Sequence, residues 1–271
     1  MPRSKSPDEA EILARSAPVA AAGSAVRRRF TATELADFMR CGLRYELLHL
    51  RGLPADLILS ESRASERPPG HVVGSLLHEV IEKARGREGL SAALDRVIAS
   101  NAAYAPIASA LRRECAPILA RFEKTALAAR ILSPDARRER QFSFLLDEYL
   151  LEGKIDALAG GDIVDFKSDD IEPSEAAAHA EAYRSQMDLY ALACERLTGK
   201  APERVALYFL RPGIEIAWNY GAAGLEAAAS RVRETIGLIQ NGPPYATAAG
   251  DACRCEYQTL CRFIARRRAT R

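Results

Sequence analysis

Three residues with clear chemical potential, Asp156, Asp165 and Lys167, lie within the stretch LLEGKIDALAGGDIVDFKS. This stretch predicts a β-hairpin, because two apolar-rich runs flank a turn signal centred on Gly160-Gly161. Counting outward from that turn, Asp156 stands directly opposite Asp165. Side chains alternate along a strand, so Lys167 shares a face with Asp165. Two carboxylates and one amine are therefore expected on one face of the hairpin.

Two directly opposed carboxylates destabilise a strand pair unless something neutralises them. A hard divalent cation such as Mg²⁺ removes this cost and is commonly held by one or two carboxylates together with substrate phosphates. Lys167 would then be placed to orient a water molecule that attacks a phosphorus atom. The same register sets Lys154 opposite Lys167, so we expect the strands to splay or bulge there, or nearby acids to compensate.

The composition is that of an ordinary globular protein with one large domain. The chain has 271 residues, of which 48% are hydrophobic and 27% charged, and its net charge is +2. No apolar run is long enough to span a membrane and no signal-peptide core is evident, so we expect a cytoplasmic location and no membrane partner. Nucleic-acid affinity would have to come from local basic patches at 27–29, 137–140 and 262–271.

Six cysteines in a reducing compartment argue against a disulfide framework. Cys115 and Cys194 occur in helical patterns and are interpreted as small buried apolar residues. The other four are Cys41 near the start and three cysteines crowded near the C-terminus, at positions 253, 255 and 261.

Around the hairpin, the pattern predicts a mixed central β-sheet flanked by helices, preceded by a helical N-terminal part. A capping box at 31–34 opens a helix, and a second helix carries His78, with Gly74 one turn earlier allowing a close approach of the backbone. Glu139, on a strand that enters the hairpin, is interpreted as a surface charge or an outer-shell acid. The expected helices span 32–50, 72–85, 90–132 (broken near Pro106 or Pro117), 173–197 (closed by Gly199) and 224–240; the expected strands span 138–146, 150–158, 163–167, 205–210 and 214–220.

Five blocks of this sequence together resemble a known family. They are TATELADFMRCGLRYELLHLRGLP, VGSLLHEVIE, the pair LEGKIDAL and IVDFKS, YRSQMDLY, and CRCEYQTLC. In this order they resemble the RecB/AddB-type nuclease domain of the PD-(D/E)XK superfamily, which is related to CRISPR adaptation nucleases. The resemblance covers residues 30–263 and implies an α/β, restriction-endonuclease-like core. The composition of 1–29, rich in Ala, Ser, Pro and charge, predicts a disordered leader or linker, and 264–271 is a basic tail.

The resemblance also implies a set of site residues. Asp156, Asp165 and Lys167 would be catalytic, and Lys167 would position the nucleophilic water. The ligands of an Mg²⁺ or Mn²⁺ ion would be His78, Asp156, Asp165 and the carbonyl of Phe166. Gln186 and Tyr190 would contact the DNA strand near the scissile phosphate.

The function implied is that of a metal-dependent DNA exonuclease, acting in DNA end processing and recombinational repair. The resemblance also implies a helicase subunit or helicase domain as a partner. This sequence has no phosphate-binding Walker loop, so we expect that it does not drive translocation itself. The alternatives are a DNA-binding or helicase-associated module that does not cleave, and a stand-alone endonuclease or CRISPR adaptation nuclease.

Many members of the family hold a [4Fe–4S] cluster with one early and three late cysteines. Cys41 with Cys253, Cys255 and Cys261 has that number and placement. The spacing departs from the usual pattern, because C-x-C-x5-C replaces C-x2-C-x5-C. The sequence therefore leaves three readings open: an iron–sulfur cluster, a tetrahedral Zn²⁺ site, or thiols without a cofactor.

Overall fold

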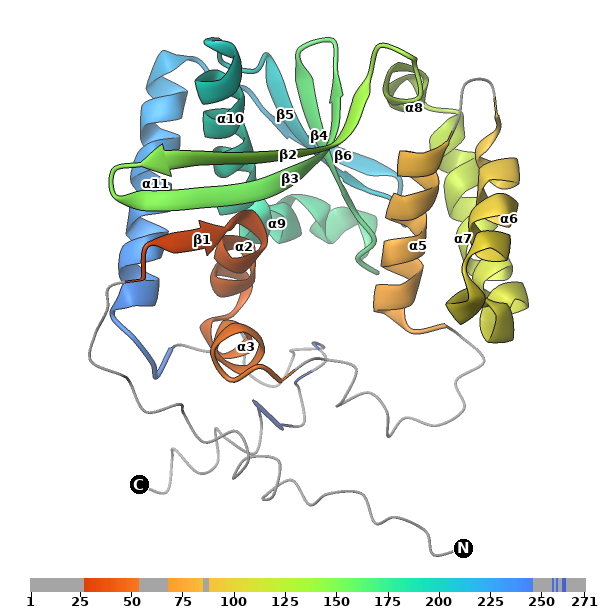
Figure 1. Cartoon of the computed structure of the whole chain (residues 1–271), viewed down its shortest axis with the longest axis horizontal. Helices are drawn as coiled ribbons and strands as arrows, with labels where there is room; N and C mark the ends of the chain where they lie inside the picture. The colour runs from red at the N-terminus through yellow and green to blue at the C-terminus, as the bar shows by residue number, and fades with distance from the viewer. Residues whose placement is uncertain are drawn as a thin grey trace, which may run out of the picture.

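The computed structural model describes residues 27–53, 68–84, 88–245, 255, 257 and 260–261. Figure 1 shows a twisted sheet with α2, α10 and α11 on one side and α5, α6 and α7 on the other. Each side has its own apolar core, one around Leu189 and Val232 and the other around Leu77 and Phe122. The expected α/β fold, with a mixed central sheet flanked by helices, is confirmed. In the described part of the chain, no helix is both long and apolar enough to cross a bilayer.

Six strands form the sheet, in the order β1-β3-β4-β5-β6, with β2 paired to the other edge of β3. The pairs β1–β3 and β4–β5 are parallel and the other pairs are antiparallel. The strands are β1 (Arg29–Thr31), β2 (Arg137–Leu146), β3 (Tyr149–Ala159), β4 (Asp162–Lys167), β5 (Arg204–Phe209) and β6 (Ile214–Trp218).

The strand β3 has an uncovered stretch along one edge. β2 takes one edge almost from end to end, so β1 and β4 must share the other. On that shared edge, β1 pairs with residues 150–152 and β4 pairs with residues 157–159. Residues 153–156 between them have no strand partner there among the described residues, and this gap contains Asp156.

The helices on the two sides are short and frequently interrupted. They are α2 (Ala32–Arg40), α3 (Gly42–Tyr45), the π-helical turn η1 (Glu46–Leu50), α5 (Gly70–Lys83), α6 (Leu90–Ser100), the 3₁₀ turn η2 (Ala102–Ile107), α7 (Ala108–Glu123), α8 (Ala126–Ile131), η3 (Pro173–Glu175), α9 (Ala176–Ala180), η4 (Glu181–Tyr183), α10 (Arg184–Thr198) and α11 (Ala222–Gln240).

Two expected helices are corrected by the structure. The helix expected over 32–50 does open with the Thr31–Glu34 capping box, but it breaks at Cys41, whose backbone is extended (φ −168°, ψ 117°). The helix expected over 173–197 consists of three short turns followed by α10, which ends as predicted at Gly199 in the left-handed conformation. The helical region 90–132 breaks after Ser100, where the 3₁₀ turn η2 containing Pro106 follows, and again before α8 at Thr125, whereas Pro117 lies inside α7.

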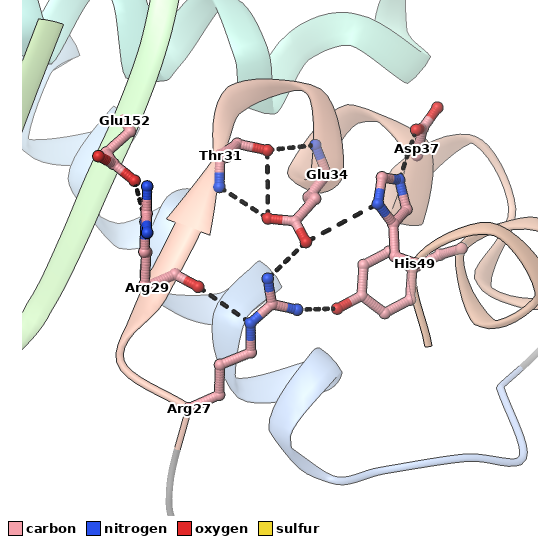
Figure 2. Close-up of polar contacts among 8 residues, drawn as sticks. Arg27, Arg29, Thr31, Glu34, Asp37, His49 and Glu152 are labelled. Carbon is pink, nitrogen blue, oxygen red and sulfur yellow. Dashed lines mark hydrogen bonds and ion pairs between the residues drawn. The ribbon is translucent and has the colours of Figure 1, made fainter. Parts of the chain in front are cut away.

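The fold begins earlier than Phe30. Most of the predicted leader, and the predicted basic tail at 264–271, lie outside the described residues, but Arg29 opens β1. Arg27 donates a hydrogen bond of 2.9 Å to the hydroxyl of Tyr45 and pairs with Glu34, as Figure 2 shows for Glu34. These contacts join the start of the chain to α2 and to the helical turn that follows it.

Candidate active site

The predicted register of the hairpin is confirmed. Gly160 and Gly161 form the turn with φ angles of 62° and 90°, and Ala157 pairs with Val164. The ladder ends at that pair, so the strands separate where Asp156 would face Asp165. The Asp156 carboxylate instead accepts a hydrogen bond of 2.8 Å from the backbone N–H of Phe166. The expected splay therefore occurs at the acidic pair itself.

The two lysines of the hairpin face are kept apart by different acids. Lys154 pairs with Glu139, whereas the Lys167 ammonium lies 2.7 Å from Asp165 Oδ2. Lys167 also donates a hydrogen bond of 2.9 Å to Gln186 Oε1. Nearby acids thus neutralise both lysines, as the second of the two expectations stated, and the strands also separate as the first one stated.

His78 reaches the same place from α5. Its Nδ1 atom lies 3.3 Å from Asp156 Oδ2. Gly74, one turn earlier, allows this approach, because a Cβ atom there would lie 2.5 Å from the Oγ atom of Ser168, the residue after Lys167. Burial by itself would lower the pKa of His78, but the carboxylate of Asp156 outweighs it and the pKa is raised.

A cleft of about 480 Å³ opens beside this group, between α5 and the β2–β3 hairpin. Its walls include four carboxylates, from Glu79, Glu82, Glu139 and Asp156. Asp156 keeps its charge: burial would raise its pKa, but His78, Lys167 and the N–H of Phe166 lower it on balance. Four carboxylates outnumber the single lysine of the lining, Lys154, so the cleft is acidic on balance and suits a cation.

The side chains of His78, Glu139 and Asp156 each place one ligand atom within 4.8 Å of the others. Carboxylate oxygens suit Mg²⁺ and Mn²⁺, and an imidazole is tolerated better by Mn²⁺, so the donor set fits a divalent ion. Sequence reasoning left Glu139 as a surface or outer-shell acid. The register between β2 and β3 could have indicated its place in the site. Arg138 pairs with Ala157 and Arg140 pairs with Ile155, so Glu139 faces Asp156.

Asp165 lies on the inner side of the site and is only 2% exposed. Its carboxylate contacts Lys167 and accepts a hydrogen bond of 3.1 Å from the Tyr190 hydroxyl. Burial raises its pKa, and the charge of Asp156 adds to that rise. Asp165 is not part of the group of three ligand atoms described above, so metal ligation by Asp165 and by the Phe166 carbonyl stays a prediction.

Gln186 and Tyr190 are brought to the site by α10, and both are buried. Gln186 contacts Lys167 through its oxygen, and its nitrogen donates a hydrogen bond of 2.7 Å to the Tyr190 hydroxyl. That hydroxyl also lies 2.9 Å from the carbonyl oxygen of Lys154, inside the gap along β3. The contacts of both side chains thus run to other parts of the site, and their predicted contact with DNA stays a prediction.

Sequence reasoning gave no role to Tyr183 and Asp169, which support Lys167 from its other side. The ammonium of Lys167 lies 4.7 Å from the centre of the Tyr183 ring. The Tyr183 hydroxyl in turn donates a hydrogen bond of 3.0 Å to Asp169, which His179 also contacts at 3.1 Å. An aromatic ring against an ammonium stabilises the charge. Lys167 is therefore held by β4 through Asp165, by α10 through Gln186 and by η4 through Tyr183.

Three of the four candidate cluster cysteines border the same small apolar core. Cys41, Cys255 and Cys261 all pack against a small apolar core that includes Leu43 and Tyr257. Cys253 lies outside the described residues. Of the two cysteines predicted to be buried, Cys115 is buried, and burial raises its thiol pKa to about 12, whereas Cys194 is only half-buried.

The chain is similar to known proteins in its fold and in its family. No curated protein sequence matches it. Among solved structures, it is similar to a protein named as a putative exonuclease from Eubacterium rectale, with 16% identity, a TM-score of 0.50, and coverage of 94% of this chain and 92% of the other. A second, SSO0001, has 16% identity, a TM-score of 0.42 and coverage of 89% of each chain. The family model described as the PD-(D/E)XK nuclease superfamily matches residues 29–262, and the chain belongs to that superfamily.

Proposed function

We propose that this protein is a divalent-metal-dependent DNA nuclease that works as an exonuclease. Membership of a nuclease superfamily supports phosphodiester hydrolysis in general. The observation that carries the proposal is the separation of β3 and β4 at Asp156, which leaves this carboxylate beside His78 at a cleft while Lys167 is held close by.

The position of each residue suggests its role in hydrolysis. Asp156 and His78, at the cleft, would hold the divalent ion, with Asp165 as the further ligand that the family resemblance implies. A bound divalent ion lowers the pKa of a water molecule and stabilises charge developing at phosphorus. Lys167 keeps its proton, because its contacts with Asp165 and Tyr183 raise its pKa against the opposing effect of burial. Its ammonium is therefore suited to orient a water molecule or a phosphate oxygen.

The exonuclease mode and a place in DNA end processing and recombinational repair are the finer part of the proposal. They draw on the sequence blocks that resemble RecB/AddB-type domains, with a helicase as the partner. The name of the similar Eubacterium rectale protein also motivates the exonuclease mode, although a likeness at this identity concerns the fold alone. A stand-alone endonuclease, a CRISPR adaptation nuclease and a non-cleaving DNA-binding module are the alternatives.

The deciding experiment is cleavage of end-labelled DNA, single- and double-stranded, linear and circular, with Mg²⁺ or Mn²⁺. The wild type is compared with Asp165→Ala and Lys167→Ala, and with Lys200→Ala as a matched control at an exposed lysine. Degradation of linear DNA alone, lost in the first two variants and kept in the control, is the expected result.

Other results would redirect the proposal. Cutting of circular DNA would favour an endonuclease. The absence of cleavage with either metal, in folded protein with its cysteine group loaded, would favour a module that binds DNA without cleaving it or that needs a helicase partner.

The cysteine group is proposed to hold a [4Fe–4S] cluster, with Zn²⁺ as the less favoured alternative. The shared packing of Cys41, Cys255 and Cys261 supports one structural site that ties the late cysteines to the break between α2 and α3. Analysis of iron, sulfide and zinc in the purified wild type and in Cys41→Ser tests this. If neither iron nor zinc is present in stoichiometric amount, the cysteines are thiols without a cofactor.

A further inference from the structure

We propose that Glu139 is a third side-chain ligand of the divalent ion, and that Lys154 competes with the ion for the Glu139 carboxylate. The inference rests on the proposed metal-dependent function and names a residue that none of the motif blocks contains. Three observations carry it: the backbone at Glu139, the surroundings of its carboxylate, and the exposure of Lys154.

The backbone of β2 is irregular at Glu139, although the strand keeps the same register on both sides of it. The pairs Arg138–Ala157 and Arg140–Ile155 flank the position, but no ladder pair joins Glu139 to Asp156, which faces it. Glu139 has a φ of 54°, in the left-handed region that non-glycine residues seldom adopt. An unfavourable backbone conformation in mid-strand persists only where its surroundings hold it in place, and such positions concentrate at functional sites.

The carboxylate of Glu139 is largely shielded from solvent and lies near other possible metal ligands. Its side chain is only 12% exposed. One of its oxygens lies within 4.8 Å of the ligand atoms of His78 and Asp156. The Lys154 ammonium lies against Oε2 and forms an ion pair with it. A buried carboxylate needs a positive partner, and the neighbouring ligand atoms allow a metal ion to be that partner.

Lys154 can leave its ion pair with Glu139 at little cost. Half of its side chain is exposed (51%), and it lines the cleft, so its ammonium can move into water while the metal ion replaces it as the positive partner of Glu139. An ion pair with one solvated member is weak, and an ion with two charges, held by His78 and Asp156 as well, binds Glu139 more strongly than one ammonium does. Lys154 is then available to a DNA phosphate in the cleft.

The test is Mn²⁺ binding by titration calorimetry and by electron paramagnetic resonance, without DNA. Glu139→Gln, which preserves size, should weaken Mn²⁺ binding by at least about tenfold, as loss of a supporting group at a metal site does. Glu139→Asp, which withdraws the carboxylate, should weaken it as well. Lys154→Met should tighten binding, and this gain should vanish in the double variant with Glu139→Gln. Glu82→Gln, which removes a carboxylate from the same cleft but not from the ligand group, is the matched control.

Three results would overturn the inference. Equal Mn²⁺ affinity in the wild type and in both Glu139 variants would remove Glu139 from the ligand set. The same gain from Lys154→Met with and without Glu139 would make Lys154 a general repulsive charge and not a competitor. A wild type that binds no Mn²⁺ would reject the metal site and the proposed function together, whereas Mn²⁺ binding that is indifferent to Glu139 would reject only this inference.

Discussion

Gln186 joins Lys167 to Tyr190. Its oxygen accepts a hydrogen bond of 2.9 Å from the Lys167 ammonium, and its nitrogen donates one of 2.7 Å to the Tyr190 hydroxyl. Tyr190 and Lys167 both contact Asp165, so the four side chains close a ring. Because α10 supplies two members and β4 the other two, the ring fixes α10 against β4.

Gln186→Ala should lower kcat by an order of magnitude or more, with a small change in the affinity for DNA. The variant leaves Lys167 with Asp165 and the Tyr183 ring, but without the acceptor that sets its direction. Steady-state kinetics on linear DNA, together with DNA binding in Ca²⁺, separate the two quantities. Asn219→Ala, at an exposed amide, is the control. A large loss of DNA affinity with kcat unchanged would support the contact with DNA that the family resemblance implies.

Tyr190→Phe should destabilise the protein by about 1–3 kcal/mol. The substitution removes the hydroxyl that contacts both the carbonyl oxygen of Lys154 and the carboxylate of Asp165, and losing a hydrogen bond to a buried acceptor has a cost of this size. The ring itself stays buried, so apolar packing is retained. Urea unfolding gives the free energy of unfolding. Tyr149→Phe, which removes an exposed hydroxyl contact with Gln240, should change it far less. Equal effects of the two substitutions would contradict a special role for the Tyr190 hydroxyl.

The parts of the fold that were predictable are those set by local chemistry. Two glycines fix the turn, and the turn fixes the register, which the sequence predicted correctly as far as the Ala157–Val164 pair. The capping box at Thr31 and the left-handed Gly199 are equally local. The superfamily itself followed from motif order, and the family match supports it.

The parts that were missed depend on distant partners. Strand β1 has three residues and exists because β3 offers it an edge more than a hundred residues away. The break at Cys41 has only Gly42 beside it as a local signal, and a single glycine within a helical pattern does not by itself end a helix. Glu139 reaches the site through a left-handed backbone that local propensity argues against. The hydrogen bond from Tyr190 to the carbonyl of Lys154 arises only because two strands leave a gap between them.

Gly153→Ala and Gly237→Ala should have opposite effects on stability. A Cβ atom at Gly153 would lie 2.5 Å from the buried ring of Phe142, which packs edge-on against Tyr190. Overpacking of this kind costs about 1–3 kcal/mol. Gly237 is exposed within α11, and a Cβ atom there meets nothing within 4 Å, so alanine should stabilise by about 0.5–1 kcal/mol through helix propensity. Urea unfolding of both variants checks the signs, and a neutral Gly153→Ala would mean that Phe142 has room to move.

Asp37 should make the stability of the N-terminal helices depend on pH. Burial would raise its pKa, but His49, at 2.7 Å, and Arg44 lower it on balance, below the ordinary value of 3.8 (Figure 2 shows Asp37 and His49). A lowered pKa in the folded state stabilises the protein above pH 3.8, and this stabilisation disappears as the pH falls through the folded-state pKa.

The wild type should therefore exceed Asp37→Asn in free energy of unfolding at pH 7, and the difference should shrink steadily below pH 3.8. Urea unfolding at a series of pH values measures it, with Asp135→Asn, at an exposed position, as the control that stays close to the wild type. A difference between the wild type and Asp37→Asn that is the same at every pH would show that the charge of Asp37 is not what holds α2 to the turn at His49. The contribution would then come from the shape of the side chain and its neutral hydrogen bonds.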